Sequence, residues 1–189
     1  MKDTPIIIRQ AVLEDARALL DIYTPYVLNT AVTFEYEPPT EEEFRSRIEH
    51  ITARFPYLVA QRGDELLGYA YAKPFHERPA FSWTAESSIY LRADAIGLGL
   101  GRRLYGELEA LLKKQGIVQL VALVAATENE DEYLSNHSSA FHRHMGFEEF
   151  GRLSRCGCKF SRWYDMLWLV KTLNPHSQPQ SAVRSVHEV

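Results

Sequence analysis

The chain has 189 residues, of which 46% are hydrophobic and 24% charged, and its formal net charge is −4 at pH 7. This length and composition suit one globular domain with a sizeable core. The slightly acidic balance argues against a surface built for nucleic acid or for anionic membranes. We therefore expect no nucleic-acid partner and no membrane partner.

The cysteines and the N-terminus bear on the cellular compartment. Cys156 and Cys158 are too few and too close together for a disulfide framework, so reduced thiols are expected. No apolar run is long enough to span a bilayer, and the first residues lack the apolar region of a signal peptide. We expect a cytoplasmic location. A C-x-C pair alone is a weak metal signal, and we expect no metal site.

Hydrophobic periodicity and turn signals predict the elements of the first half of the chain. In order, they are a strand at 6–9, a helix at 13–23, a loop at 29–39, a helix after Thr40 that buries Phe44, Ile48 and Ile51, and strands at 57–61, 66–73 and 81–92. Two local signals bear on the helix bounds. Pro25 bends or ends the first helix, and Thr40 with Glu43 forms a capping box at the second.

The second half continues with alternating elements. They are a helix after Gly101 that ends at Gly116, a strand at 117–124, an acidic loop at 127–135, a helix at 138–145, and strands at 147–153 and 164–173 around a hairpin at 155–162. The order β-α-α-β-β-β-α-β-α-β-β predicts an α/β fold with a mixed sheet flanked by helices. Residues 1–173 form one domain in this interpretation. Residues 174–189 lack periodicity, and we expect a disordered tail.

A strand, a glycine loop and a helix follow one another over residues 87–116. Gly97, Gly99 and Gly101 alternate with other residues directly before the helix, and Arg102 and Arg103 stand in its first turn. Glycine lets the backbone approach a ligand closely, and the free N–H groups of a helix start hold anions. A plain glycine-rich turn is the alternative. Cations at a helix start oppose the helix dipole, which favours an anionic ligand such as a phosphate.

The spacing excludes two familiar phosphate loops. No Lys-Ser or Lys-Thr follows the glycines, as a P-loop requires, and G-x-G-x-G is not the G-x-G-x-x-G of a dinucleotide fold. The stretch instead resembles motif A of the GNAT superfamily of N-acetyltransferases, [QR]-x-x-G-x-[GA], whose end is matched by Gly99-Leu100-Gly101. Ile96 stands where that motif has Gln or Arg. The resemblance implies a GNAT fold from about residue 6 to 173.

Further matches narrow the resemblance. The run from Trp83 to Leu91, W-T-A-E-S-S-I-Y-L, is similar to the W-T-x-E-x-[ST]-[IV]-Y-[VL] of phosphinothricin and methionine sulfoximine N-acetyltransferases. Asn136, Ser139 and His142 with Gly146-Phe147 resemble a second motif of that group, N-x-x-S-x-x-L-H-x-x-x-G-F/Y, with one residue fewer between Ser139 and His142. The acidic loop before Asn136 is longer than in the group.

The resemblance implies three sets of site residues. The acetyl-CoA set is Ile89, Tyr90, Leu91, Gly97, Leu98, Gly99, Leu100, Gly101, Arg102, Asn136 and Ser139; the acceptor set is Phe34, Glu35 and Arg78; the catalytic set is Glu86 and His142. Glu86 would be the base that deprotonates the acceptor amine. His142 would protonate the leaving thiolate. Arg78 would bind a carboxylate or phosphinate through its planar guanidinium.

Each role has a structural alternative. Glu86 could be a solvated or Arg-paired strand residue, His142 an ordinary helical histidine, and Asn136 a helix N-cap. Phe34 and Glu35 could pack within their loop.

The leading hypothesis is an N-acetyltransferase that moves acetyl from acetyl-CoA directly to a small amino-acid-like amine. Other GNAT acceptors are a protein N-terminus, a polyamine or an antibiotic amine. A non-catalytic CoA-binding domain is the alternative from another class, and the presence of Glu86 argues against it. The resemblance also implies a homodimer.

Overall fold

Seven strands form one sheet in the order β1-β2-β3-β4-β5-β7-β6 in a computed structural model, which describes residues 4–189. The strands are β1 (Ile6–Gln10), β2 (Tyr57–Arg62), β3 (Glu65–Pro74), β4 (Thr84–Leu91), β5 (Gln119–Ala126), β6 (Glu148–Lys159) and β7 (Arg162–Thr172). The helices are α1 (Ala16–Asn29), α2 (Glu41–Thr52), α3 (Leu100–Gln115) and α4 (His137–His144). This order confirms the predicted α/β fold with a mixed sheet.

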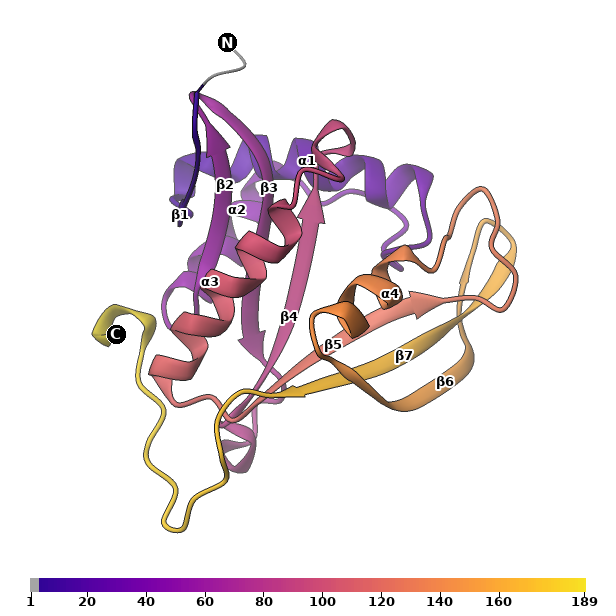
Figure 1. Ribbon diagram of the computed structural model, residues 1–189. Coiled ribbons are helices and arrows are strands. Elements are labelled where there is room, and N and C mark those ends of the chain that lie inside the picture. The colour runs from indigo at the N-terminus through magenta and orange to yellow at the C-terminus, as the bar shows by residue number, and fades with distance from the viewer. Residues whose placement is uncertain (1–3) are drawn as a thin grey trace.

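Helices cover both faces of the sheet. Figure 1 shows α3 in front of the strands β1 to β4 and α1 and α2 behind them. The predicted apolar stripe of α3 lies in the core, since Leu104, Leu108 and Leu112 are fully buried. Phe44, Ile48 and Ile51 of α2 are buried as well. The main core therefore lies around β2, β3 and β4, and the strand that carries Glu86 packs in it through the neighbouring Ala85.

The sheet opens between β4 and β5. These two strands pair in parallel over three residues, from Thr84 opposite Gln119 to Glu86 opposite Val121. Beyond Glu86 they diverge, and Figure 1 shows β4 and β5 as the two arms of a V. β5 continues to pair with β7 along its whole length. The gap at the middle of the sheet leaves backbone and side chains of both strands available to a ligand.

The first helix continues past Pro25, where a bend or an end was predicted. α1 runs to Asn29 although Pro25 lacks the N–H that a helix interior uses. Tyr23 and Val27 on either side of the proline are buried against the sheet. Their burial offsets the lost hydrogen bond, so tertiary packing overrides the local signal.

The second helix keeps half of its predicted capping box. The Thr40 hydroxyl accepts a hydrogen bond from the Glu43 amide at 3.1 Å. The Glu43 carboxylate does not reach back, because it is paired with Arg47 at 2.8 Å. The start of the helix is therefore defined by Thr40 alone.

The last hairpin is tighter than predicted. β6 extends to Lys159, and only Phe160 and Ser161 turn the chain, both with φ near +52° to +60°. Positive φ at both central residues is the turn geometry that matches the twist of a hairpin. Residues 155–159 of the predicted hairpin at 155–162 therefore belong to β6. Residues Gly157 to Lys159 of β6 lie next to the loop after α1, which contains Phe34 and Glu35.

Residues 174–189, for which we expected a disordered tail, are mostly exposed but make hydrogen bonds to the domain. The backbone N–H of Arg184 donates to the Gln115 carbonyl at 2.9 Å, and the Gln115 side chain donates to the Arg184 carbonyl at 2.9 Å. The Trp83 indole N–H donates to the Ser181 carbonyl at 2.7 Å. The segment thus connects the end of α3 with the residue before β4.

Among residues 4–189, no helix combines the length and apolar character needed to cross a bilayer.

Candidate active site

The predicted cradle lies at the start of α3. Gly97 and Gly99 have φ values of +88° and +74°, which other residues rarely adopt. No described protein atom lies within 4 Å of where a Cβ on either glycine would stand, so the space above the loop is open. The first amides of α3, from Leu100 onward, have no partner within the helix. The loop and helix start therefore form a backbone site for an anion.

Side chains around the cradle divide into surface and core. Leu98 is half exposed, whereas Leu100 and Gly101 are buried, and a Cβ on Gly101 would lie 3.0 Å from the Phe141 ring. Gly101 is thus needed for the close approach of α3 to α4. The Arg102 guanidinium lies on the surface, 2.9 Å from the His144 ring nitrogen. Arg102 is therefore placed to add a positive charge beside the free amides.

A narrow cavity of about 50 Å³ occupies the opening between β4 and β5. From β4 it is lined by Ser87, Ser88, Ile89 and Tyr90, from β5 by Leu123, Val124 and Ala125, and elsewhere by Val32, Ser138 and His142. Its small volume leaves no room for a bulky group. Ile89, Tyr90 and His142, predicted as ligand-binding or catalytic residues, meet here.

His142 is buried beside this channel, with both ring nitrogens engaged. Nδ1 lies 2.7 Å from the Ser138 carbonyl, which can only accept, so Nδ1 carries the proton in the neutral ring. Nε2, 2.8 Å from the Tyr105 hydroxyl, is then the acceptor. Burial lowers the pKa of His142 below its ordinary value of 6.5, which keeps the ring neutral. This arrangement does not favour His142 as a direct proton donor.

A larger cavity of about 580 Å³ lies on the other side of β4. Five tyrosines line it, namely Tyr23, Tyr57, Tyr69, Tyr71 and Tyr90. Burial raises the pKa of Tyr23 to about 12 and that of Tyr90 well above the ordinary value, so these hydroxyls stay protonated. The wall can therefore donate several hydrogen bonds to oxygen atoms of a bound molecule. The two cavities adjoin each other, because both are lined by Val32, Ser88, Tyr90 and Leu123.

Glu86 lines the large cavity and is paired with a lysine. Its carboxylate lies 3.0 Å from Lys73 Nζ, and its side chain is 16% exposed. The two residues face each other across β3 and β4. The partner of Glu86 is thus a lysine and not the arginine considered from the sequence, and the Glu86 side chain faces the large cavity.

The loop after α1 supplies the opposite wall. Phe34 and Glu35 line the large cavity as predicted, and the Glu35 carboxylate is 2.9 Å from Arg47 of α2. The ring of Phe34 packs directly on Gly157. Lys159, itself buried, donates to the Thr33 carbonyl at 2.8 Å. The end of the β6–β7 hairpin therefore holds this wall in place.

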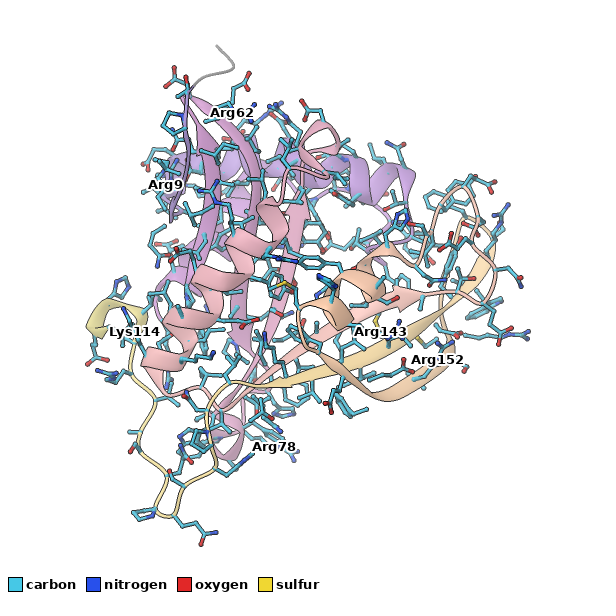
Figure 2. The ribbon with its side chains drawn as sticks, in the orientation of Figure 1. Arg9, Arg62, Arg78, Lys114, Arg143 and Arg152 are labelled. Atoms are coloured by element: carbon cyan, nitrogen blue, oxygen red, sulfur yellow. The ribbon has the colours of Figure 1, made fainter. Side chains whose placement is uncertain are left out.

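Three predicted residues make other contacts. Arg78 does not line the large cavity; Figure 2 shows it at the lower end of the molecule, by the turn that precedes β4. The Asn136 amide donates to the Thr127 carbonyl at 2.9 Å, which ties α4 to the end of β5. Ser139 is buried and donates to the Asn136 carbonyl at 2.9 Å. These polar side chains are thus used within the fold.

Leu91 also differs from expectation in its surroundings. Its carbonyl accepts a hydrogen bond from the Tyr26 hydroxyl at 2.6 Å, and it lines neither cavity. The strand therefore meets the channel through residues 87–90, and Leu91 lies beyond it.

Sequence reasoning missed two cations of the large cavity. Lys73 and Arg47 both line it, yet neither belongs to a motif. The two predicted strands 66–73 and 81–92 carry Lys73 and Glu86, but no pairing of these strands was predicted, and the pairing is what places the two residues opposite each other. Arg47 carries no sequence signal, since its position depends on how α2 packs on the sheet.

Comparisons with known proteins agree with this geometry. The family model described as acetyltransferase (GNAT) domain matches residues 8–168. The phosphinothricin N-acetyltransferase of Alcaligenes faecalis is 38% identical over 162 residues, which cover 85% of this chain and 79% of that protein. An L-methionine sulfoximine/L-methionine sulfone acetyltransferase of Pseudomonas aeruginosa is 34% identical, covering 89% of this chain and 95% of that protein.

A solved structure shows the same fold. The phosphinothricin acetyltransferase of Sinorhizobium meliloti, in complex with acetyl-CoA, superposes with a TM-score of 0.82 at 34% identity, covering 95% of this chain and 99% of the other. The family match spans most of the sheet, the cradle and both cavities. The chain belongs to the GNAT family of acetyltransferases.

Proposed function

We propose that this protein transfers the acetyl group of acetyl-CoA to the amine of a small amino-acid-like acceptor, of the phosphinothricin or methionine sulfoximine type. The position of Glu86 carries the proposal. Glu86 lines the large cavity together with Ser88 and Tyr90, which also line the narrow channel. A carboxylate therefore stands where an acceptor in one cavity would meet a thioester in the other.

The chain's residues fit acetyl-CoA at two places. The free amides at the start of α3 and the Arg102 guanidinium suit its diphosphate. The channel between β4 and β5 suits its unbranched pantetheine arm. When bound, acetyl-CoA supplies an activated acetyl group. The names of the relatives and of the acetyl-CoA complex support this assignment.

Glu86 performs the proton transfer in this proposal. Its carboxylate removes a proton from the acceptor's ammonium, which leaves a lone pair on nitrogen. That nitrogen bonds to the thioester carbonyl carbon, the carbon–sulfur bond breaks, and sulfur leaves with the electron pair. The second proton that nitrogen loses as the amide forms passes to this sulfur, which leaves as the thiol of CoA. Direct transfer is supported because Cys156 and Cys158 line neither cavity, so no acyl-cysteine step is required. His142 holds the Tyr105 hydroxyl in place near the channel.

A thiol-release assay tests the function. Methionine sulfoximine, methionine sulfone and phosphinothricin are compared with a polyamine and with a peptide that has a free N-terminus. The proposal predicts release of CoA with the amino-acid acceptors and formation of their N-acetyl products by mass spectrometry. Turnover of the polyamine or peptide alone would show another GNAT acceptor. Acetyl-CoA binding with no turnover on any amine would favour a CoA-binding domain.

The proposal includes a homodimer. Phe150, Leu153 and Trp163 on the last two strands are each more than half exposed. Phe150 contacts Trp168, which in turn contacts Phe75 of the loop before β4. Phe150 and Leu153 lie on the edge strand β6, whose unpaired backbone can also accept a neighbour.

Sedimentation tests the dimer. The native chain should sediment as a dimer, and Phe150→Asp should shift it toward the monomer because a charge would be buried at the interface. A monomeric native chain at micromolar concentration would remove the dimer from the proposal. A cytoplasmic site of action also belongs to the proposal, supported by the two free cysteines.

A further inference from the structure

Lys73 and Glu86 form a pair of opposite charges on the cavity wall. They are cross-strand partners in β3 and β4, so both side chains leave the same face of the sheet. Nζ of Lys73 lies 3.0 Å from Oε1 of Glu86, and both residues line the large cavity. Lys73 is 42% exposed and Glu86 is 16% exposed, so the lysine is the outer member of the pair.

Lys73 has more remaining binding capacity than the other cation of this wall. Arg47 is paired with Glu35 at 2.9 Å and with Glu43 at 2.8 Å. Within residues 4–189, Glu86 is the one carboxylate paired with Lys73. An ammonium group has three N–H donors, so Lys73 can bind a second anion without leaving Glu86. Arg78 lies outside the cavity.

An α-amino acid carries its ammonium and carboxylate on the same carbon. A cation and an anion 3.0 Å apart on one wall present the complementary pattern. We propose that Lys73 binds the acceptor's α-carboxylate while Glu86 receives its ammonium, so that the site selects α-amino acids over amines that lack the carboxylate. This inference rests on the proposed function and names the residue that recognises the acceptor's head group.

The pairing also affects the base. With an acceptor that has no carboxylate, Lys73 has no competing anion, and one oxygen of Glu86 stays engaged by it. With an α-amino acid, the carboxylate shares the lysine, and Glu86 is more available to the ammonium. Lys73 is a specificity residue in this view, and Glu86 remains the base.

The test compares methionine sulfoximine with its α-carboxamide, which keeps the amine and the side chain but lacks the charge. The measured quantity is the ratio of kcat/KM for the acid to kcat/KM for the amide, at saturating acetyl-CoA. A ratio of about 10 to 100 is expected for the native chain, as a hydrogen bond to a charged group provides. A ratio near one overturns the inference without any variant.

Variants locate the effect. Lys73→Met should bring the ratio close to one, and Lys73→Arg should restore most of it. Lys114→Met, which removes a surface charge at the far end of α3, is the matched control and should keep the native ratio. A merely structural role of Lys73 would lower both kcat/KM values together and leave their ratio unchanged, which would contradict the inference.

Arg78→Met is the competing variant. If its ratio falls to one while Lys73→Met keeps the native value, Arg78 is the carboxylate-binding residue and the inference is wrong. Absence of turnover with both compounds and with the other amino acids is a different result. It refutes the proposed function itself.

Discussion

Gly157→Ala tests how the acceptor wall is held. Gly157 is a buried residue of β6, and a Cβ added there would lie 2.2 Å from one carbon of the Phe34 ring and 2.5 Å from another. Ordinary van der Waals contact begins near 3.4 Å. The ring would therefore have to move by roughly 1 Å. Because Phe34 lines the acceptor cavity, its displacement changes the site as well as the packing.

The expected cost follows from overpacking, which destabilises a protein by about 1–3 kcal/mol. For a chain of this size, 1 kcal/mol changes Tm by about 2–4 °C. We therefore expect Tm to fall by about 2–12 °C in Gly157→Ala. The acceptor KM should rise, whereas the acetyl-CoA KM should not change, because the three atoms nearest to a Cβ at position 157 all belong to Phe34 and none to the cradle on α3.

Thermal unfolding and steady-state kinetics measure both effects. Gly151→Ala is the matched control on the same strand, since its nearest neighbour, Cβ of Trp168, would be 4.0 Å away. Phe34→Leu in the Gly157→Ala background should recover stability, because the smaller side chain removes the clash. Equal Tm losses in the two glycine variants, or an unchanged acceptor KM in Gly157→Ala, would refute this account of the wall.

Three other predictions concern the base, the cradle and pH. Glu86→Gln should lower kcat by about 10²- to 10⁴-fold with little change in acetyl-CoA KM; turnover near the native rate would remove Glu86 as the base. Gly99→Ala should raise acetyl-CoA KM, because φ of +74° strains alanine by about 1–2 kcal/mol, while Gly63→Ala, at +58° in a distant turn, should affect stability alone. Burial lowers the pKa of His142, so as the pH falls the histidine is protonated in the unfolded chain before it is protonated in the folded one. The contribution of His142 to the free energy of unfolding is therefore constant above about pH 6.5 and falls as the pH drops below that value. Tm measured at pH 7.5 and 5.5 should differ less in His142→Gln, and an equal difference would exclude this source.

Much of the site could be predicted from local patterns. The glycine loop and the helix after it are contiguous in sequence, and their chemistry depends on backbone groups that local conformation exposes. The same holds for the strand that carries Glu86, whose alternation indicates which side chains share a face. These parts agree with the structure because each is set by residues close together in the chain.

The acceptor cavity could not be assembled in this way. Its wall combines Tyr71 and Lys73 of β3, Arg47 of α2 and Phe34 of a loop, which meet only through packing. Arg78 was predicted for this pocket because of its loop, yet the loop lines the cavity through Pro74 and Glu77 and not through Arg78. The helix through Pro25 has the same cause, since burial of Tyr23 and Val27 outweighs the local preference. The segment 174–189 is held instead by hydrogen bonds to Gln115 and Trp83, which are distant in the sequence.

The sequence by itself determined the order of elements and the glycine loop before α3, because short-range hydrogen bonding and hydrophobic periodicity encode them, and its motifs indicated the family. The tertiary structure alone decided which charged side chains line the same cavity, how far β4 and β5 diverge, and which ring nitrogen of His142 carries the proton. Those features depend on the distances and burial of groups far apart in the chain, and such distances exist only once the core has formed.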